Sequence, residues 1–269
     1  MSGITNEAAQ RAAGVSPIEG SLDPRGETSS VPIPQIRAPF RADFPNVVIH
    51  RPYGSAVRYV QHPDYAAAKA GDPEAAVRFV DAMVDPATMA ELRAILGDRK
   101  PTVVAVHAEE AAGRNAIPER YAYVLARDFK LPLDEDIVQA NRTGRTGQSG
   151  EYRLAVHAEF DGPLQPGRDY LIVDDNVTQG GTPADLRSYI ETRGGYVVGA
   201  TTLTGSRQSE MLASVPELES RWKAAFGYGF SSLTQGEAAY LLRSPKADFL
   251  EDRVIARAQE RTAPQIQGD

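Results

Sequence analysis

The stretch YLIVDDNVTQGGTPADLRSYI, residues 170–190, passes from an apolar strand through two adjacent acids and a pair of glycines into the start of a helix. Asp174 and Asp175 follow directly on the apolar residues of the strand. Carboxylates at the end of a buried strand are costly to remove from water unless a ligand or a partner group binds them. The stretch therefore predicts a binding site where the strand meets the loop.

Strands and helices alternate on both sides of this stretch. The predicted strands are 101–108, 135–140, 168–175 and 196–205, and the predicted helices between them are 116–129 and 183–195. Continuous apolar strands separated by amphipathic helices are typical of a parallel sheet that helices cover on both faces. We therefore predict an α/β fold, a parallel sheet flanked by helices.

The rest of the chain is expected to complete one domain, residues 46–258, around a core at 100–205. The N-terminal section 52–97 is rich in alanine and predicts helices. In it, Asp72 and Asp85 each precede a proline and are expected to cap a helix, and Gly97 is expected to end the second helix. A C-terminal helical segment is predicted at 206–258. A flexible leader rich in proline, 1–45, and a tail, 259–269, are expected outside the domain.

The composition and net charge exclude several kinds of site and argue against some kinds of partner. The chain has 269 residues, a net charge of -7 and no cysteine, which excludes disulfides, thiolate chemistry and cysteine metal sites. Because duplex binding needs several Lys or Arg contacts to phosphates, the negative charge argues against nucleic acid as a partner. The four histidines, His50, His62, His107 and His157, lack the spacing of a zinc site. No apolar run of about 18 residues and no secretory signal is present, so we predict a cytoplasmic protein with no membrane partner.

The end of the quoted stretch predicts a helix start. Thr182 is a plausible N-cap, Pro183 suits the first helical position, and Asp185 stands where a capping box places an acid. The backbone N–H groups of residues 178–182 would then converge at a helix N-terminus, which attracts phosphate.

The loop and the acids together indicate a class of ligand. Gly180 and Gly181 permit a positive φ and a close approach of the ligand to the backbone. The acids can accept hydrogen bonds from vicinal hydroxyls, and Mg²⁺ would balance their charge. A sugar with a 5-phosphate and free 2- and 3-hydroxyls satisfies the loop and the acids at once.

The residues LIVDDNVTQGGT, 171–182, resemble the phosphoribosyl pyrophosphate (PRPP) motif of the type I phosphoribosyltransferases. The motif consists of an apolar strand, two adjacent acids and a phosphate loop of threonine and glycine. Gln179 departs from it, because the family usually has a small residue there. A weaker resemblance extends over residues 100–205. The matching residues are Asp174, Asp175, Thr178, Gly180, Gly181 and Thr182.

The resemblance implies a Mg²⁺-dependent transfer of ribose 5-phosphate from PRPP to a small-molecule acceptor, with release of pyrophosphate. Asp174 and Asp175 would hold the ribose hydroxyls and the metal. A homodimer is implied by the resemblance alone. The residues implied to bind the 5-phosphate are Thr178, Gln179, Gly180, Gly181 and Thr182.

Two further loops are assigned by the same resemblance. The family binds pyrophosphate in the loop after the first core strand, where Arg114 is the candidate; a solvated arginine or a salt bridge at the helix start is the alternative. The family's mobile loop corresponds to 140–154, where Arg142 would bind pyrophosphate and Arg145 would assist catalysis. This loop lacks the family's lysine, and a simple solvated loop remains the alternative.

The aromatic stretch at 221–242 is the candidate acceptor site. Tyr228 and Phe230 lie in a turn that contains glycine and could stack on a planar acceptor such as a nucleobase. The alternative is that the aromatic residues form a helix face in the core, since Trp222 and Phe226 are four residues apart.

Three functions remain open from the sequence. The first is the phosphoribosyltransferase. The second is a regulatory protein that binds PRPP without chemistry, motivated by Gln179 and the missing loop lysine. The third is synthesis or hydrolysis of PRPP, for which the sequence offers no strong ATP site.

Overall fold

The computed structural model describes residues 37–41, 44–55, 59–106, 109–110, 113–141, 153 and 156–206, and residues 220, 223–224, 232–234, 236–237 and 240. The chain divides into two compact units, residues 1–34 and 35–269, and all described residues belong to the second unit. The segment predicted as C-terminal and helical lies largely outside the described residues.

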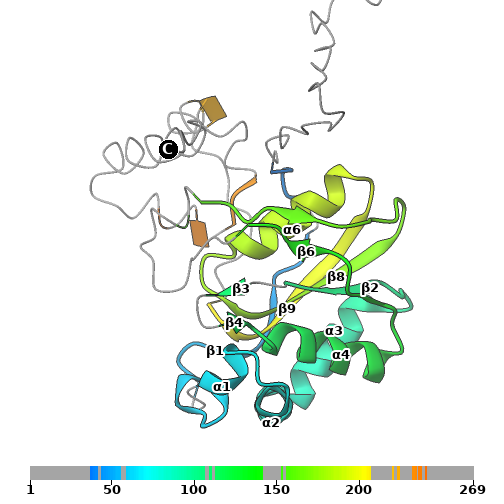
Figure 1. The fold of residues 1–269 in the computed structure, drawn as a ribbon. Helices are drawn as coiled ribbons and strands as arrows, with labels where there is room; N and C mark the ends of the chain where they lie inside the picture. The colour runs from blue at the N-terminus through cyan, green and yellow to red at the C-terminus, as the bar shows by residue number, and fades with distance from the viewer. Residues whose placement is uncertain are drawn as a thin grey trace, which may run out of the picture. The chain divides into compact units, whose positions relative to one another are not determined.

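A five-stranded sheet forms the centre of the described chain (Figure 1). Its strands lie in the order β1-β9-β8-β2-β5, and every neighbouring pair is parallel. This confirms the predicted α/β class. The strands are β1 Val48–Pro52, β2 Thr102–Ala105, β5 Leu133–Asp134, β8 Asp169–Val177 and β9 Tyr196–Gly205.

Helices cover both faces of the sheet (Figure 1). Successive residues of β8 alternate between the two faces: Leu171 and Val173 pack in the cluster that includes α2, α3 and α4, and Tyr170 and Ile172 pack in the cluster that includes α6. Burial on both faces explains why the strand reads as a continuous apolar run. The helical elements are η1 Tyr59–Gln61, α1 Tyr65–Lys69, α2 Pro73–Met83, α3 Pro86–Leu96, α4 Ile117–Phe129 and α6 Gly181–Thr192.

The predicted caps of the N-terminal helices are confirmed. Asp72 accepts hydrogen bonds from the N–H groups of Glu74 and Ala75 at the start of α2. Asp85 accepts one from the N–H of Thr88 at the start of α3, and Gly97 with a φ of 55° ends that helix. These local signals were readable because capping involves residues close together in the sequence.

The strand predicted at 135–140 is confirmed only at Val138–Gln139, and it does not join the parallel sheet. The sheet is instead extended by β5, and Val138–Gln139 forms a strand, β6, that pairs antiparallel with β7, Phe160–Asp161. The reason lies in Asp134, whose Oδ1 accepts hydrogen bonds from the N–H groups of Asp136 and Ile137, each at 3.0 Å. Such an Asx turn directs the chain out of the sheet ahead of the apolar residues Ile137 and Val138.

The domain includes residues that the sequence assigned to the leader. β1 lies at the sheet edge beside β9, although the sequence suggested neither a strand there nor order before residue 46. Residues 37–41, assigned to the leader, pack against α6. The Arg187 guanidinium donates to the carbonyl of Pro39 at 3.0 Å and lies 3.9 Å from the Phe40 ring centroid.

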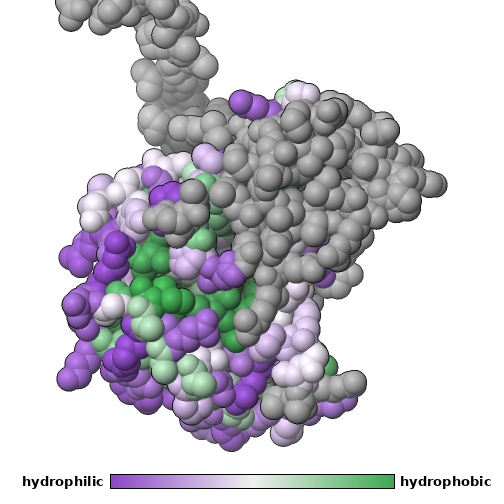
Figure 2. Space-filling view, turned by 180° about the vertical axis from the view of Figure 1, so that it is seen from behind, coloured by the Kyte–Doolittle hydropathy of each residue, from purple (hydrophilic) through white to green (hydrophobic). Residues whose placement is uncertain are grey.

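Hydrophilic and apolar residues occupy different parts of the described surface. Viewed from behind, apolar residues gather near the centre of the face, with hydrophilic ones around them (Figure 2). Among the described residues, no helix combines the length and the apolar character that a bilayer crossing requires.

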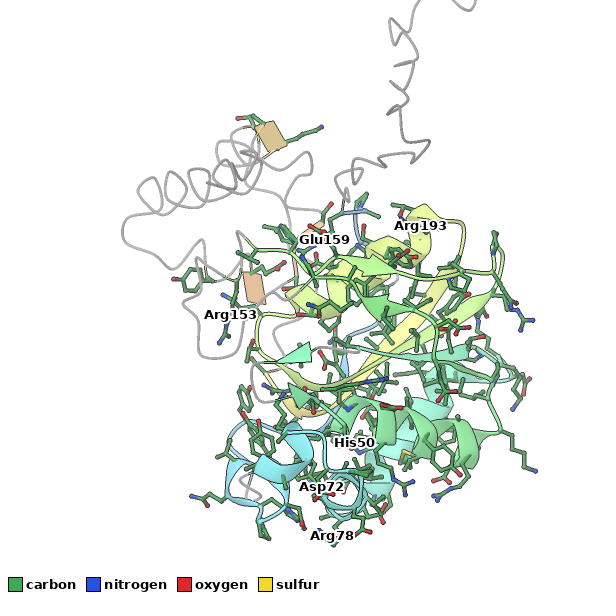
Figure 3. All side chains as sticks on the ribbon, viewed as in Figure 1. His50, Asp72, Arg78, Arg153, Glu159 and Arg193 are labelled. Atoms are coloured by element: carbon green, nitrogen blue, oxygen red, sulfur yellow. The ribbon has the colours of Figure 1, made fainter. Side chains whose placement is uncertain are left out.

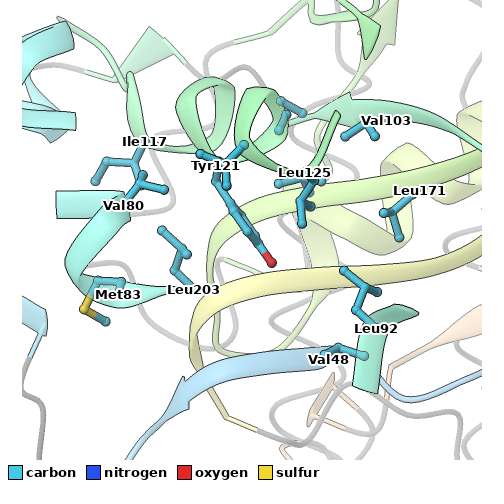
Figure 4. Close-up of a cluster of buried hydrophobic side chains, with 14 of the residues drawn as sticks. Val48, Val80, Met83, Leu92, Val103, Ile117, Tyr121, Leu125, Leu171 and Leu203 are labelled. Atoms are coloured by element: carbon cyan, nitrogen blue, oxygen red, sulfur yellow. The ribbon is translucent and has the colours of Figure 1, made fainter. Parts of the chain in front are cut away.

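Tyr121 of α4 packs among the buried hydrophobic side chains of the core (Figure 4), and its hydroxyl takes part in a buried chain of hydrogen bonds. The Tyr121 hydroxyl lies 2.6 Å from Nε2 of His50 and 2.8 Å from Oγ1 of Thr201. The N–H of Asp85 donates to Nδ1 of His50 at 2.8 Å, so Nε2 carries the proton of the neutral ring. Burial, which outweighs the nearby charge of Asp85, lowers the pKa of His50 to about 4.

This lowered pKa predicts a loss of stability in acid. Between the ordinary pKa of 6.5 and about 4, the unfolded chain takes up a proton that the folded chain excludes, so stability falls as pH decreases. Between pH 7 and pH 4, the wild type should lose about 3 kcal/mol more than a His50→Gln variant. Urea denaturation at a series of pH values measures this difference, and parallel curves for the two proteins would contradict it.

Candidate functional site

Asp174 and Asp175 lie near the carboxyl end of β8, as the sequence predicted. The strand does not end at Asp175 but continues to Val177, which pairs with Gly205 of β9. Both acids are buried, each with a 7% exposed fraction. Alternation along the strand places Asp175 on the face of Leu171 and Val173 and Asp174 on the opposite face.

The two acids have different environments. Burial and the adjacent charge of Asp175 raise the pKa of Asp174 well above its usual range, and Oδ1 of Asp174 accepts a hydrogen bond from the Asp175 N–H at 2.8 Å. A carboxyl group with a raised pKa can donate as well as accept hydrogen bonds. Nζ of Lys69, the last residue of α1, lies 3.0 Å from Oδ2 of Asp175.

The contact between Lys69 and Asp175 is an ion pair rather than a directed hydrogen bond. Its distance is short, yet within the described part of the chain Oδ2 of Asp175 has no partner with hydrogen-bond geometry. The two observations are compatible, because Coulomb attraction depends on distance and hydrogen bonding depends also on angle. The oxygen therefore has a neighbouring cation and can still accept a hydrogen bond from a ligand.

The predicted phosphate loop leads from β8 into α6, but the predicted helix cap is wrong. The helix begins at Gly181, one residue before Thr182, and its N-cap is Gly180 in the left-handed conformation with a φ of 76°. Gly180 has no side chain with which to cap the helix. Asp185 is not part of a capping box; tertiary contacts, described below, take up its carboxylate. The N-terminus of α6 therefore begins at a glycine, whose lack of a side chain suits a close approach of an anion to the backbone.

Arg153 brings a positive charge to this loop. Its Nη1, on the side chain labelled in Figure 3, donates to Oγ1 of Thr178 at 3.0 Å. The sequence grouped it with the arginines of the predicted mobile loop. A guanidinium beside a threonine hydroxyl and a helix N-terminus is suited to bind phosphate.

Tyr53, directly after β1, contacts Asn176 of β8, shortly before the phosphate loop. Its hydroxyl donates to Oδ1 of Asn176 at 2.7 Å, and its ring stacks on Tyr59 with 6.1 Å between centroids. Although Tyr53 is 46% exposed, partial burial raises the pKa of its hydroxyl, and the charge of Arg153 acts in the opposite direction. The sequence analysis missed this residue because it missed β1.

A buried ionic cluster supports the loop from behind. Arg37, with a 1% exposed fraction, donates through Nε to Oδ1 of Asp185 at 2.8 Å and through Nη1 to Oε2 of Glu237 at 2.5 Å. It also donates to the carbonyl of Gly181 at 3.2 Å. Nδ1 of His157 lies 2.9 Å from the same Asp185 oxygen. The first turn of α6 is therefore joined to two segments distant in sequence.

Of the remaining predicted site residues, the structure describes only Arg114. Arg114 in β4, Gly113–Arg114, is exposed and pairs with Glu119 at 3.3 Å, the salt-bridge alternative that the sequence left open. Its assignment to pyrophosphate stays a prediction. The other predicted residues lie outside the described residues: Arg142, Arg145, Tyr228 and Phe230.

The acids alone fit a magnesium ion only in part. Among the described residues, no three or more His, Asp or Glu side chains are grouped so as to hold a metal. Mg²⁺ commonly binds through one or two carboxylates plus waters and substrate phosphates. Asp174 and Asp175 therefore fit an ion whose other ligands come from a phosphorylated substrate.

Comparison with known proteins gives sequence relatives without a shared family description. No protein-family model matches the chain. Protein TraN of Escherichia coli is 42% identical over 236 residues, which are 83% of this chain and 52% of TraN. An uncharacterized protein of Haemophilus influenzae is 38% identical over 156 residues, which are 58% of this chain and 34% of that protein. The chain thus spans about half or less of these curated relatives.

Two solved structures of enzymes align with the chain at low scores. A phosphoribosyltransferase from Corynebacterium diphtheriae aligns with a TM-score of 0.30 and 15% identity, over 52% of this chain and 85% of the enzyme. UMP synthase of Leishmania donovani aligns with a TM-score of 0.27 and 14% identity, over 68% of this chain and 35% of the synthase. Scores of this size do not define a shared fold, so the α/β assignment rests on the parallel sheet itself.

Proposed function

We propose that this chain binds PRPP and transfers its ribose 5-phosphate to a small nucleophilic acceptor. One observation carries the proposal: two buried acids near the carboxyl end of β8 are followed by a loop whose left-handed Gly180 opens helix α6. The carboxyl ends of parallel strands are where ligands bind in such sheets. The contact of Arg153 with Thr178 supports a phosphate at the loop.

Different residues of the site would bind different parts of PRPP. The N–H groups of residues 178–182 and the Arg153 guanidinium would hold the 5-phosphate. Asp175 would accept hydrogen bonds from the ribose hydroxyls, and Asp174, with its raised pKa, would donate or accept beside it. The predicted roles of Arg114, Arg142 and Arg145 at pyrophosphate, and of Tyr228 and Phe230 at the acceptor, are part of this proposal.

The proposed reaction is a displacement at the anomeric carbon. The bond from this carbon to the pyrophosphate oxygen breaks, its electron pair leaves with pyrophosphate, and a lone pair of the acceptor forms the new bond. Positive charge develops on the ribose ring, so fixed carboxylates beside its hydroxyls favour the transition state. Bound Mg²⁺ would supply charge neutralisation of the leaving diphosphate.

The test is calorimetric titration of PRPP with Mg²⁺, followed by assays of pyrophosphate release with a panel of nucleobases and amines. Asp175→Asn is expected to weaken PRPP binding about 100-fold, because a charge-assisted hydrogen bond to the ribose is lost. Asp169→Asn is the matched control, since Asp169 lies on the same strand at its opposite end. Equal PRPP affinity in the wild type and Asp175→Asn rejects the proposed site.

A PRPP-binding regulatory protein is the second candidate. The pairing of Arg114 with Glu119 favours it, because the predicted pyrophosphate ligand is committed to another partner. Tight PRPP binding that depends on Asp175, with no pyrophosphate release across the panel, would support this candidate.

A further inference from the structure

Lys69 is held firmly beside the acids by its surroundings. Ala68 is fully buried, and its carbonyl accepts a hydrogen bond from the Ala116 N–H at 3.1 Å. The turn after α1 is also in tight backbone contact with β4. A Cβ atom on Gly71 would lie 2.9 Å from the carbonyl oxygen of Arg114, and a Cβ atom on Gly113 would lie 2.7 Å from the carbonyl oxygen of Ala70. The end of α1 therefore has little freedom to move away from β8.

The position of Lys69 matters because it provides the charge that a metal ion would otherwise bring. Its side chain is only 17% exposed, and Nζ lies 3.0 Å from Oδ2 of Asp175. The ammonium group has three N–H donors and can orient more than one oxygen. A ribose hydroxyl could donate to Asp175 while its oxygen accepts from Lys69.

A divalent cation is a poor substitute at this position. Mg²⁺ requires close to octahedral coordination by oxygen and loses its waters reluctantly. It would have to displace Lys69 from Asp175, and no third acid stands beside the pair within the described residues. The site is therefore better equipped for a sugar diol than for a metal held by protein alone.

We propose that Lys69 is the built-in counter-cation of Asp175, so that the ribose hydroxyls bind without metal and Mg²⁺ enters only with the diphosphate of PRPP. This inference rests on the proposed function and deepens it. It makes Lys69 a residue that contacts the substrate and sets the metal requirement of the site. In this proposal Lys69 is the cation beside the ribose hydroxyls, and Mg²⁺ is the cation bound to the diphosphate.

Ribose 5-phosphate, which lacks the diphosphate, is the probe. Calorimetric titrations with EDTA and with Mg²⁺ should give wild-type affinities that agree within about twofold, whereas Lys69→Gln should bind about 30-fold more weakly in EDTA. Part of this loss should return when Mg²⁺ is added to the variant. Lys69→Arg preserves the charge and should bind ribose 5-phosphate in EDTA, while Lys100→Gln, distant from the acids, is the matched control.

The outcomes separate this inference from the proposed function. If wild-type ribose 5-phosphate binding needs Mg²⁺, or if Lys69→Gln binds as tightly as the wild type, the inference is overturned while PRPP binding stands. If the wild type binds neither PRPP nor ribose 5-phosphate with or without Mg²⁺, the proposed function and the inference both fail. Thermal unfolding of each variant checks that a loss of binding is not a loss of folding.

Discussion

Replacing Arg37 with methionine is expected to lower the free energy of unfolding by about 4 kcal/mol, because it leaves two buried carboxylates without their cation. Asp185 and Glu237 have exposed fractions of 4% and 1%, and Arg37 binds both. Denaturant titration monitored by circular dichroism measures the change. The loss should also weaken ribose 5-phosphate binding, since Arg37 holds the carbonyl of Gly181 at the phosphate loop.

Two further variants test the cause of this effect. Arg78→Met removes an arginine that pairs with Asp64 on the surface, and it should leave stability nearly unchanged because solvent screens exposed ion pairs. Arg37→Met combined with Asp185→Asn and Glu237→Gln should lose less stability than Arg37→Met alone, since no buried charge then remains unpaired. If the triple variant is the less stable of the two, the charge explanation is wrong.

Substituting alanine for Gly205 is expected to lower the free energy of unfolding by about 4 kcal/mol, through backbone strain and overpacking together. Gly205 ends β9 with a φ of 142°, a conformation that residues with a side chain rarely adopt. Its Cβ would lie 2.2 Å from the carbonyl oxygen of Val177, which is backbone and cannot rotate away. Because Val177 precedes the phosphate loop, ligand binding should fall as well.

Gly199→Ala is the control within the same strand. Gly199 has no positive φ, and its Cβ would meet the Pro45 ring at 3.5 Å, an ordinary contact distance. Alanine there should change stability by less than about 1 kcal/mol. Thermal unfolding of both variants checks this contrast, and equal losses would show that the clash at Val177 does not determine the effect.

The parts of the fold that the sequence predicted correctly depend on neighbouring residues. The caps at Asp72 and Asp85, the helix at 117–129 and the apolar strand before Asp174 follow from patterns within a few turns of chain. The strand predicted at 135–140 is shorter and lies outside the parallel sheet because Asp134 turns the chain, and periodicity does not report turn geometry.

The sequence predicted only those residues of the candidate site that lie close together in the chain. Asp174, Asp175 and the loop glycines stand together in one motif. Lys69 and Arg37 reach the site from segments that show no signal in the sequence, one in an alanine-rich helix and the other among prolines.

The sequence by itself determined that β8 is buried on both faces, that acids follow its apolar residues and that a loop with two glycines leads to the next helix. The tertiary structure alone decided which charges meet those acids and that helix. Hydrophobic pattern and backbone conformation are local properties, whereas the pairing of Lys69 with Asp175 and of Arg37 with Asp185 depends on how the sheet brings distant segments together. Electrostatic partners are chosen by distance in space, and that distance exists only once the chain has folded.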